Sequence, residues 1–178
     1  MSKQEFLEKI VTGAVLSRSE QIEIFKFSAP EAKEILLEYI KRHRLCKEAQ
    51  LLLFDLRPLK IAMKLLRKYM FRHYLCEEAQ VKFFAIPQKY TVNLLSNYLT
   101  LKRKLCEKAQ CKLFSLPTEI STNFVRKYVL YDDLCSGAQM KLFDLPPKEA
   151  KEIFLQQNCF DELCIEAKAK AHEIGYIA

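Results

Sequence analysis

A motif of about thirty residues recurs along the whole chain and constrains its fold more than any other feature of the sequence. Its clearest copy reads LCEEAQVKFFAIP at residues 75–87. A looser early copy reads LSRSEQIEIFKF, and the last copy, LCIEAKAKAHEI, is partial. The copies begin 29 or 30 residues apart, at Leu16, Leu45, Leu75, Leu105, Leu134 and Leu163. A fixed period in this range is typical of repeat arrays, in which each unit packs only on its neighbours.

Each copy divides at its proline into two predicted helices. In the first half, apolar residues recur at the spacing of one helical face, as at Leu75, Ala79, Phe83 and Ile86. This spacing predicts a short helix over residues 76–85. A proline then interrupts the helix, because it has no N–H to donate and restricts the residue before it. The interrupting residues are Pro58, Pro87, Pro117 and Pro146.

The second half of each copy predicts a longer helix. In the second repeat it runs from Leu59 to Tyr74, with a broad apolar face and a basic face opposite. A tyrosine recurs in this half every 29 or 30 residues, at Tyr39, Tyr69, Tyr98 and Tyr128, and Gln157 takes the fifth place. No alternating run of β-branched residues competes with the helical pattern.

These units predict one continuous all-α domain over residues 1–178. Its first residues resemble a second-half helix without its partner, and the polar helix after Leu163 is expected to cap the array. The alternative, that the chain is a piece of a longer array, stays open. The predicted divisions are an N-terminal half-repeat at 1–15, repeats at 16–44, 45–74, 75–104, 105–133 and 134–162, and a capping half-repeat at 163–178.

The helix–proline–helix pattern with its LC-x-x-AQ-x-x-LF-x-LP signature resembles the HEAT/armadillo-type α-solenoids, and its period is closest to their short variants. The resemblance covers nearly the whole chain. It implies an α-α superhelix, which we expect to be right-handed, of about five and a half helix pairs. It also implies a binding or scaffolding role in general terms, and it carries over no catalytic residue.

The cysteines are predicted to be structural. Five of the seven occupy the second position of the motif, and no CxxC occurs. Equivalent positions on stacked helices lie about 8–10 Å apart, beyond the ~7 Å Cα separation that a disulfide allows. Free thiols fit a reducing compartment. With no signal-like segment and no apolar run of about 20 residues, we expect a cytoplasmic protein with no membrane contact.

A glutamine column has two interpretations. An amide offers both a donor and an acceptor, so a ladder of amides could bind an extended peptide. Alternatively, each glutamine bonds a turn of the neighbouring repeat and fixes the stacking. Its constancy between copies favours the structural interpretation, because recognition surfaces vary while packing positions stay fixed. The column consists of Gln21, Gln50, Gln80, Gln110 and Gln139, and Lys168 ends it.

The variable polar positions lie on the second helices, one, two and five residues before the tyrosine. Columns that are polar, varied and on one face suit a ligand-reading surface, although a solvated face would look similar. We predict that this face binds a protein or peptide partner. The candidate residues are Lys60, Lys64, Arg67, Lys68, Arg72, Asn93, Asn97, Asn123, Arg126 and Lys127.

Charge concentrates in the two middle repeats. Residues 45–74 carry seven basic and two acidic groups, a net charge of +5, and residues 75–104 carry five and two, a net charge of +3. A positive patch of this size could contact phosphates, with steep salt dependence. Binding of an RNA or DNA backbone through residues 41–104 is therefore the alternative function. A third possibility is that the array spaces a larger assembly, although we expect a monomer.

Enzyme chemistry finds little support in the sequence. The three histidines, His43, His73 and His172, do not stand at metal-ligand spacing such as HExxH. With only three glycines, no phosphate-cradling loop is present. The acidic pairs Asp132–Asp133 and Asp161–Glu162 occupy turns between repeats and are interpreted as loop solvation or helix caps. We therefore expect no catalytic site, no metal and no cofactor.

Overall fold

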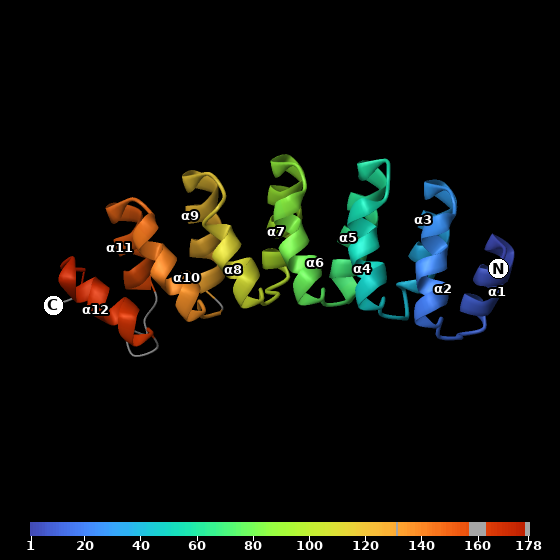
Figure 1. The fold of residues 1–178 in the computed structure, drawn as a ribbon, viewed down its shortest axis with the longest axis horizontal. Helices are drawn as coiled ribbons and strands as arrows, with labels where there is room; N and C mark the ends of the chain where they lie inside the picture. Colours follow the sequence, from blue (N-terminus) through green and yellow to red (C-terminus); the bar gives the residue numbers. More distant parts are fainter. Residues whose placement is uncertain (131, 157–162, 177–178) are drawn as a thin grey trace. The chain divides into compact units, whose positions relative to one another are not determined.

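The computed structural model describes residues 1–130, 132–156 and 163–176, and every regular element in these ranges is a helix (Figure 1). The all-α prediction is confirmed. The first helices of the pairs are α2 (Arg18–Glu23), α4 (Lys47–Asp55), α6 (Glu77–Lys82), α8 (Glu107–Leu113), α10 (Ser136–Lys141) and the C-terminal α12 (Ile165–Glu173). The second helices are the N-terminal α1 (Lys3–Val11), α3 (Ala29–Tyr39), α5 (Leu59–Arg72), α7 (Gln88–Thr100), α9 (Thr118–Val129) and α11 (Pro147–Gln156). None of the helices in the described ranges is long and apolar enough to span a bilayer.

Three first helices end in a tight 3₁₀ turn rather than continuing as α-helix. We predicted one helix over residues 76–85, but α6 ends at Lys82 and the chain tightens into η2. The last carbonyls of a helix have no partner one turn further on, and 3₁₀ turns commonly form there. The three turns are η1 (Ile24–Lys26), η2 (Phe83–Ala85) and η3 (Leu142–Asp144).

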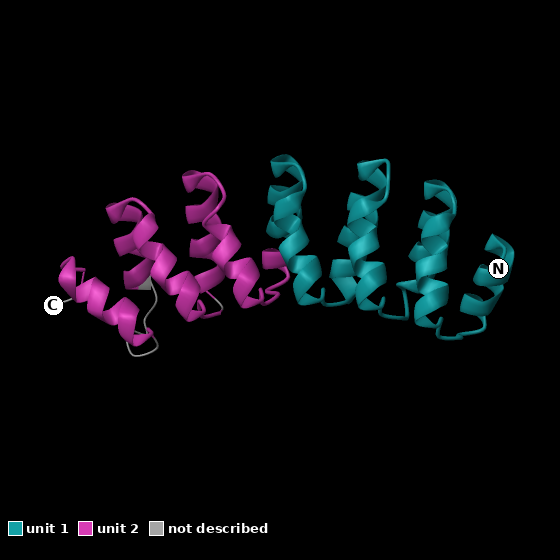
Figure 2. Ribbon diagram, viewed as in Figure 1, with its two compact units in different colours: residues 1–97 teal, residues 98–178 magenta. Residues whose placement is uncertain are grey.

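The chain divides into two compact units, residues 1–97 and residues 98–178, with the boundary inside α7 (Figure 2). In the first unit, α3 packs against both α1 and α5, and α4 packs against both α2 and α6. In the second unit, α9 packs against α11, and α10 packs against both α8 and α12. Like helices therefore stack on like helices within each unit. Tyr131 and residues 157–162, which include Gln157 and the end of the predicted fifth repeat, lie outside the described residues.

Cysteine takes the N-cap position of each first helix after α2. These residues have extended backbone and make no side-chain capping bond, at Cys46, Cys76, Cys106, Cys135 and Cys164. All five are half-buried free thiols, as predicted. Burial raises the pKa of the Cys76 thiol, although a helix N-terminus ordinarily favours the thiolate. In the first repeat, Ser17 takes the same place and forms the predicted capping box with Glu20.

A buried glutamine joins one repeat to the next. Nε2 of Gln21 donates to the carbonyl of Leu16 in its own repeat at 2.9 Å, and Oε1 accepts the backbone N–H of Cys46 in the next repeat at 2.6 Å. Because these amides are at most 6% exposed, they are not available to a ligand. The structural interpretation of the column is therefore confirmed. The joint recurs from Gln50 to Cys76, from Gln110 to Cys135 and from Gln139 to Cys164, at 2.6–2.7 Å.

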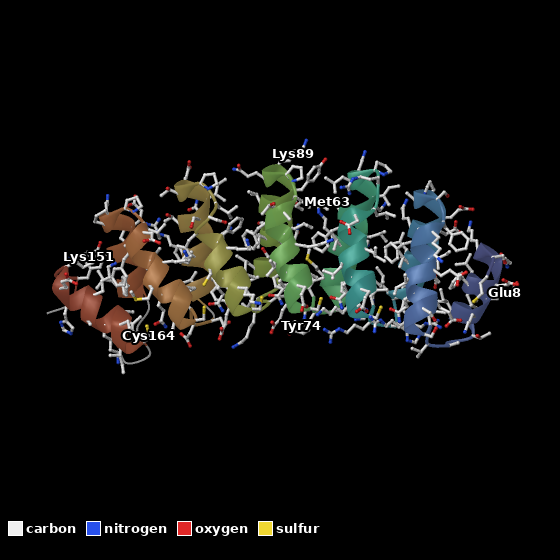
Figure 3. All side chains as sticks on the ribbon, viewed as in Figure 1. Glu8, Met63, Tyr74, Lys89, Lys151 and Cys164 are labelled. Atoms are coloured by element: carbon white, nitrogen blue, oxygen red, sulfur yellow. The ribbon has the colours of Figure 1, made fainter. Side chains whose placement is uncertain are left out.

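The tyrosine column forms the centre of the core. Tyr39, Tyr69, Tyr98 and Tyr128 are all 0% exposed. In both of the first two repeats a histidine four residues later packs on the tyrosine ring, with 5.0 Å between ring centroids in each pair. His43 and His73 are thus packing residues. Side chains fill the space between neighbouring second helices within each unit (Figure 3).

The Glu20 carboxylate links acid stability to the ion pair that joins α1 to α2. The hydrogen bond from Lys9, with those from the backbone N–H and hydroxyl of Ser17, lowers the pKa of Glu20 to about 2. Because the pKa of Glu20 is lower in the folded chain than its ordinary value of 4.5, the ionised carboxylate stabilises the fold at pH values above 4.5. This stabilisation is lost as the pH falls from 4.5 to about 2 and the carboxylate becomes protonated. In this pH range we expect the urea midpoint of Glu20→Gln to decrease less with falling pH than the urea midpoint of the unaltered chain. The exposed Glu119→Gln is the control, and identical slopes for both variants would contradict the assignment.

Candidate functional site

The second helix of the second repeat, α5, is the most strongly cationic helix of the chain. Its sequence LKIAMKLLRKYMFR contains no acidic residue. Its apolar face is buried and includes Leu65, Leu66 and Tyr69. Its exposed face carries five cations that we had predicted as binding residues, Lys60, Lys64, Arg67, Lys68 and Arg72.

This charge pattern works against the stability of α5 itself. Three pairs of cations stand four residues apart, Lys60 with Lys64, Lys64 with Lys68, and Lys68 with Arg72. Like charges at this spacing destabilise a helix by about 0.2–0.5 kcal/mol per pair. Lys60 also lies in the first turn, where the helix dipole favours an anion. A local conflict of this kind is typical of a functional site.

The exposed face of α5 borders a groove whose far side is α7. The groove has a volume of about 910 Å³. We name it the α5–α7 groove after the helices that line it. Its residues are Lys60, Met63, Lys64, Arg67, Lys68, Phe71 and Arg72 from α5, and Lys89, Tyr90 and Asn93 from α7. Six of these residues are cations and none is acidic.

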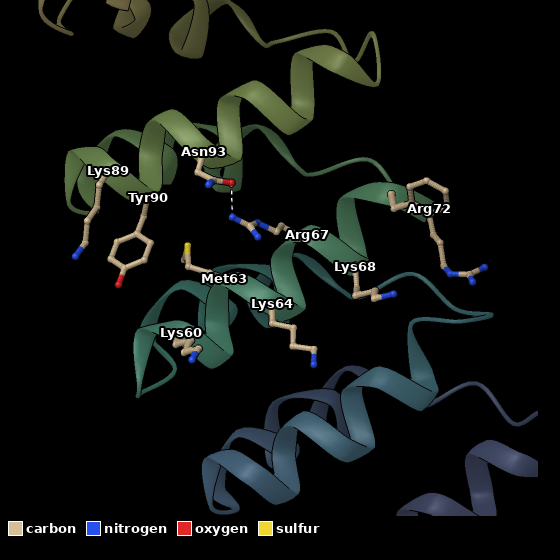
Figure 4. A pocket seen from close by; sticks show the side chains of 10 residues that line it. Lys60, Met63, Lys64, Arg67, Lys68, Arg72, Lys89, Tyr90 and Asn93 are labelled. Atoms are coloured by element: carbon tan, nitrogen blue, oxygen red, sulfur yellow. Dashed lines mark hydrogen bonds between the residues drawn. The ribbon is translucent and has the colours of Figure 1, made fainter.

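Two kinds of contact shape the interior of the groove. Met63 points from α5 toward Tyr90 of α7, and Arg67 reaches across to donate a hydrogen bond to Oδ1 of Asn93 (Figure 4). Met63 is 5% exposed and Tyr90 is half-buried, so together they form an apolar floor. Nζ of Lys89 lies 5.0 Å from the centre of the Tyr90 ring, close enough for a cation–π contact.

An exposed aromatic residue extends the apolar surface to the other end of the groove. Phe71 and Tyr74, at the C-terminal end of α5 and just after it, are 67% and 55% exposed. Phe71 lies four residues after Arg67, which is about one helical turn further along the same face, so it belongs to the cationic face. The groove residues that the sequence did not single out are Met63, Phe71, Lys89 and Tyr90.

A second, smaller groove lies on the opposite side of α5. It has a volume of about 400 Å³ and shares Lys68 and Arg72 with the first. Its other face comes from α3 and includes Glu34 and Glu38, so its charge is mixed. Nζ of Lys41 donates to Glu38 at 2.5 Å. The uniform positive charge is therefore a property of the α5–α7 groove.

Some of the variation in the polar columns has a structural cause. The residue two before a tyrosine bonds the residue five before the next tyrosine, as Arg67 bonds Asn93 and Arg126 bonds Glu152. From a different position of the helix, Lys3 of α1 pairs with Glu34 of α3 at 2.6 Å. These residues cross-link neighbouring helices. Arg126 is half-buried and engaged with Glu152, and its role in binding a partner stays a prediction.

The remaining predicted residues lie apart from the groove lining. Asn97 is exposed, and its amide donates to the carbonyl and to Oδ1 of Asn93 at 2.7 and 3.0 Å. Asn123 and Lys127 are exposed on α9, in the second unit. Of the ten predicted residues, the α5–α7 groove brings together Lys60, Lys64, Arg67, Lys68, Arg72 and Asn93.

Comparison of the chain with protein-family models, with curated proteins and with solved structures gives no match, so its function has to be inferred from the groove itself.

Proposed function

We propose that this chain is a non-enzymatic helical-repeat module that holds a protein or peptide partner in the α5–α7 groove. The observation that carries the proposal is a groove with six cations, no carboxylate and an apolar floor. The proposal includes a solenoid architecture of the short HEAT/armadillo type. It is supported by the stacking of like helices within each unit and by the repeated glutamine joint.

A protein partner suits this groove better than a nucleic-acid backbone. A phosphate chain is best served by cations that continue along its path. Here the cations are confined to α5, a helix of 14 residues, together with Lys89. The flanking helix α3 carries Glu34 and Glu38 at the positions of Lys64 and Lys68. The apolar floor also offers buried area to a peptide side chain, which sugar and phosphate would not use.

Affinity capture with the full chain tests the placement. We expect the unaltered chain to retain a protein after nuclease treatment, and Lys64→Glu with Lys68→Glu to lose at least about 90% of it, because a reversed charge repels the anions that the groove attracts. The matched control is Lys108→Glu with Lys112→Glu. It reverses two exposed lysines of α8 at the same four-residue spacing.

Three outcomes are informative. Loss of the partner from the groove variant alone supports the proposal. Equal retention by all three chains contradicts the placement on α5. Retention that disappears on nuclease treatment, with gel retardation of RNA or DNA at about 50 mM salt, assigns the groove to the nucleic-acid alternative instead.

A further inference from the structure

Among the residues that the structure describes, four cations along α5 stand without a carboxylate partner, although some other cations of the same unit have one. Within the first unit, Lys47 pairs with Glu78 at 2.5 Å and Lys82 pairs with Asp55 at 2.8 Å. In the described part of the chain, no carboxylate lies within ion-pair distance of four of the α5 cations, Lys60, Lys64, Lys68 and Arg72. Because these four cations follow one another at four-residue spacing on one helix, they form a row that is open to an external anion.

The apolar surfaces of the groove occur at two separate points. Met63 with Tyr90 forms the first, and the exposed Phe71 forms the second. Met63 and Phe71 are eight residues apart on α5, which corresponds to about 12 Å along the helix axis. The hydrogen bond from Arg67 to Asn93 crosses the groove between them. The groove therefore offers apolar, cationic and again apolar contacts in that order.

This spacing matches an extended peptide. An extended chain rises about 3.3 Å per residue, so 12 Å corresponds to about four residues. Side chains four residues apart in a strand point to the same face, and the residue midway between them points there as well. An acidic residue at the midpoint would thus meet Arg67.

We propose, building on the function proposed above, that the α5–α7 groove binds an extended acidic segment of a partner protein that carries two apolar side chains four residues apart. One side chain rests on Met63 and Tyr90, and the other rests on Phe71. Carboxylates between and beside them pair with the open cations of α5.

Fluorescence anisotropy with synthetic peptides and the full chain tests this register. The probe is an acidic heptapeptide with phenylalanine at its second and sixth positions. Its isomer has the same composition with the two phenylalanines adjacent, and a third probe is a single-stranded DNA hexanucleotide. We expect the spaced peptide to bind at least about tenfold more tightly than its isomer, since only the spaced peptide places both rings on apolar surface at once.

Variants of the chain assign the contacts. Phe71→Ala is expected to lower the affinity for the spaced peptide by about tenfold and to leave that for the isomer within about twofold. Because Phe71 is 67% exposed, its loss does not disturb the core. Lys60→Glu is expected to lower the affinity for the spaced peptide at least about fivefold, while Lys108→Glu is expected to leave that affinity unchanged. The two lysines are a matched pair, since each is the second residue of its helix and each has a lysine four residues later.

The same substitution at Lys60 gives a readout of folding. A glutamate in the first turn, followed four residues later by Lys64, suits both the helix dipole and the side-chain spacing. The melting temperature of Lys60→Glu is therefore expected to rise while its affinity falls, so the loss of binding does not come from unfolding.

Equal affinity for the two peptide isomers overturns the register, and so does tighter binding of the hexanucleotide than of the spaced peptide. Absence of peptide binding overturns the acidic, two-anchor ligand. In each of these cases, affinity capture that still depends on Lys64 and Lys68 would leave the proposed function standing, so the two failures are distinguishable.

Discussion

Replacing Gln110 by alanine is expected to lower the free energy of unfolding by about 2–4 kcal/mol, because it leaves buried polar groups without partners. The Gln110 amide donates to the Leu105 carbonyl at 3.0 Å and to the Tyr128 hydroxyl at 3.1 Å. Its oxygen accepts the N–H of Cys135 at 2.6 Å. The loss should appear as a lower urea midpoint of the helical circular dichroism signal.

Two further variants separate hydrogen bonding from packing at this position. Gln110→Met restores most of the volume without the three hydrogen bonds, so we expect it to be nearly as destabilising as alanine. Gln88→Ala removes an exposed glutamine from α7 and is expected to change stability by no more than about 0.5 kcal/mol. If methionine restores the stability, the joint is a matter of packing and its hydrogen bonds contribute little.

Removing the hydroxyl from Tyr128 is expected to lower the free energy of unfolding by about 1–3 kcal/mol, whereas the same change at Tyr69 is expected to be within about 0.5 kcal/mol of neutral. The Tyr128 hydroxyl accepts from Gln110 and from the N–H of Leu105 at 3.3 Å, and it donates to Asp132 at 2.5 Å. Tyr128→Phe therefore leaves the buried N–H of Leu105 unsatisfied.

Tyr69 occupies the equivalent place in its repeat with a different environment. Its hydroxyl is buried and makes no well-formed hydrogen bond to a described residue, although the Arg44 side chain and the backbone of Leu45 lie close to it. Burial raises the pKa of Tyr69 to about 12, which means that the folded chain keeps this hydroxyl protonated well above the usual range. Chemical denaturation of Tyr69→Phe and Tyr128→Phe at neutral pH compares the two. Equal losses for the two variants would contradict the assigned hydrogen bonds.

The repeat sequence predicted the helices well because its constraints are local and are stated several times. The LF and tyrosine positions recur at fixed spacing. The apolar face, the proline and the helix start of a copy all indicate the same helix positions. The interpretation of the glutamines as joints followed from the same constancy, and the bond from Cys46 to Gln21 confirms it. The exact end of α6 was missed, since the choice between α and 3₁₀ geometry depends on the last few carbonyls.

The site was only partly predictable because it forms between two helices. The cations of α5 share one helix, so their common face follows from spacing alone. Met63 and Tyr90 meet only once α5 and α7 are packed, and no pattern within one repeat relates them. The pairing of Arg67 with Asn93, 26 residues later, is equally invisible within one copy. The position of Phe71 on the cationic face could have been found from its i+11 spacing to Lys60.

The glutamine joint has a consequence for how such a chain can change. Its bond between repeats is made to a main-chain N–H of the next repeat, and the exposed cations of α5 take no part in it. Any repeat that begins with the leucine and an extended residue can therefore dock onto the one before it. We therefore expect that residues 45–74 can be moved to another position of the array. The moved repeat would keep its ligand preference, and the same glutamine hydrogen bonds would join it to its new neighbours.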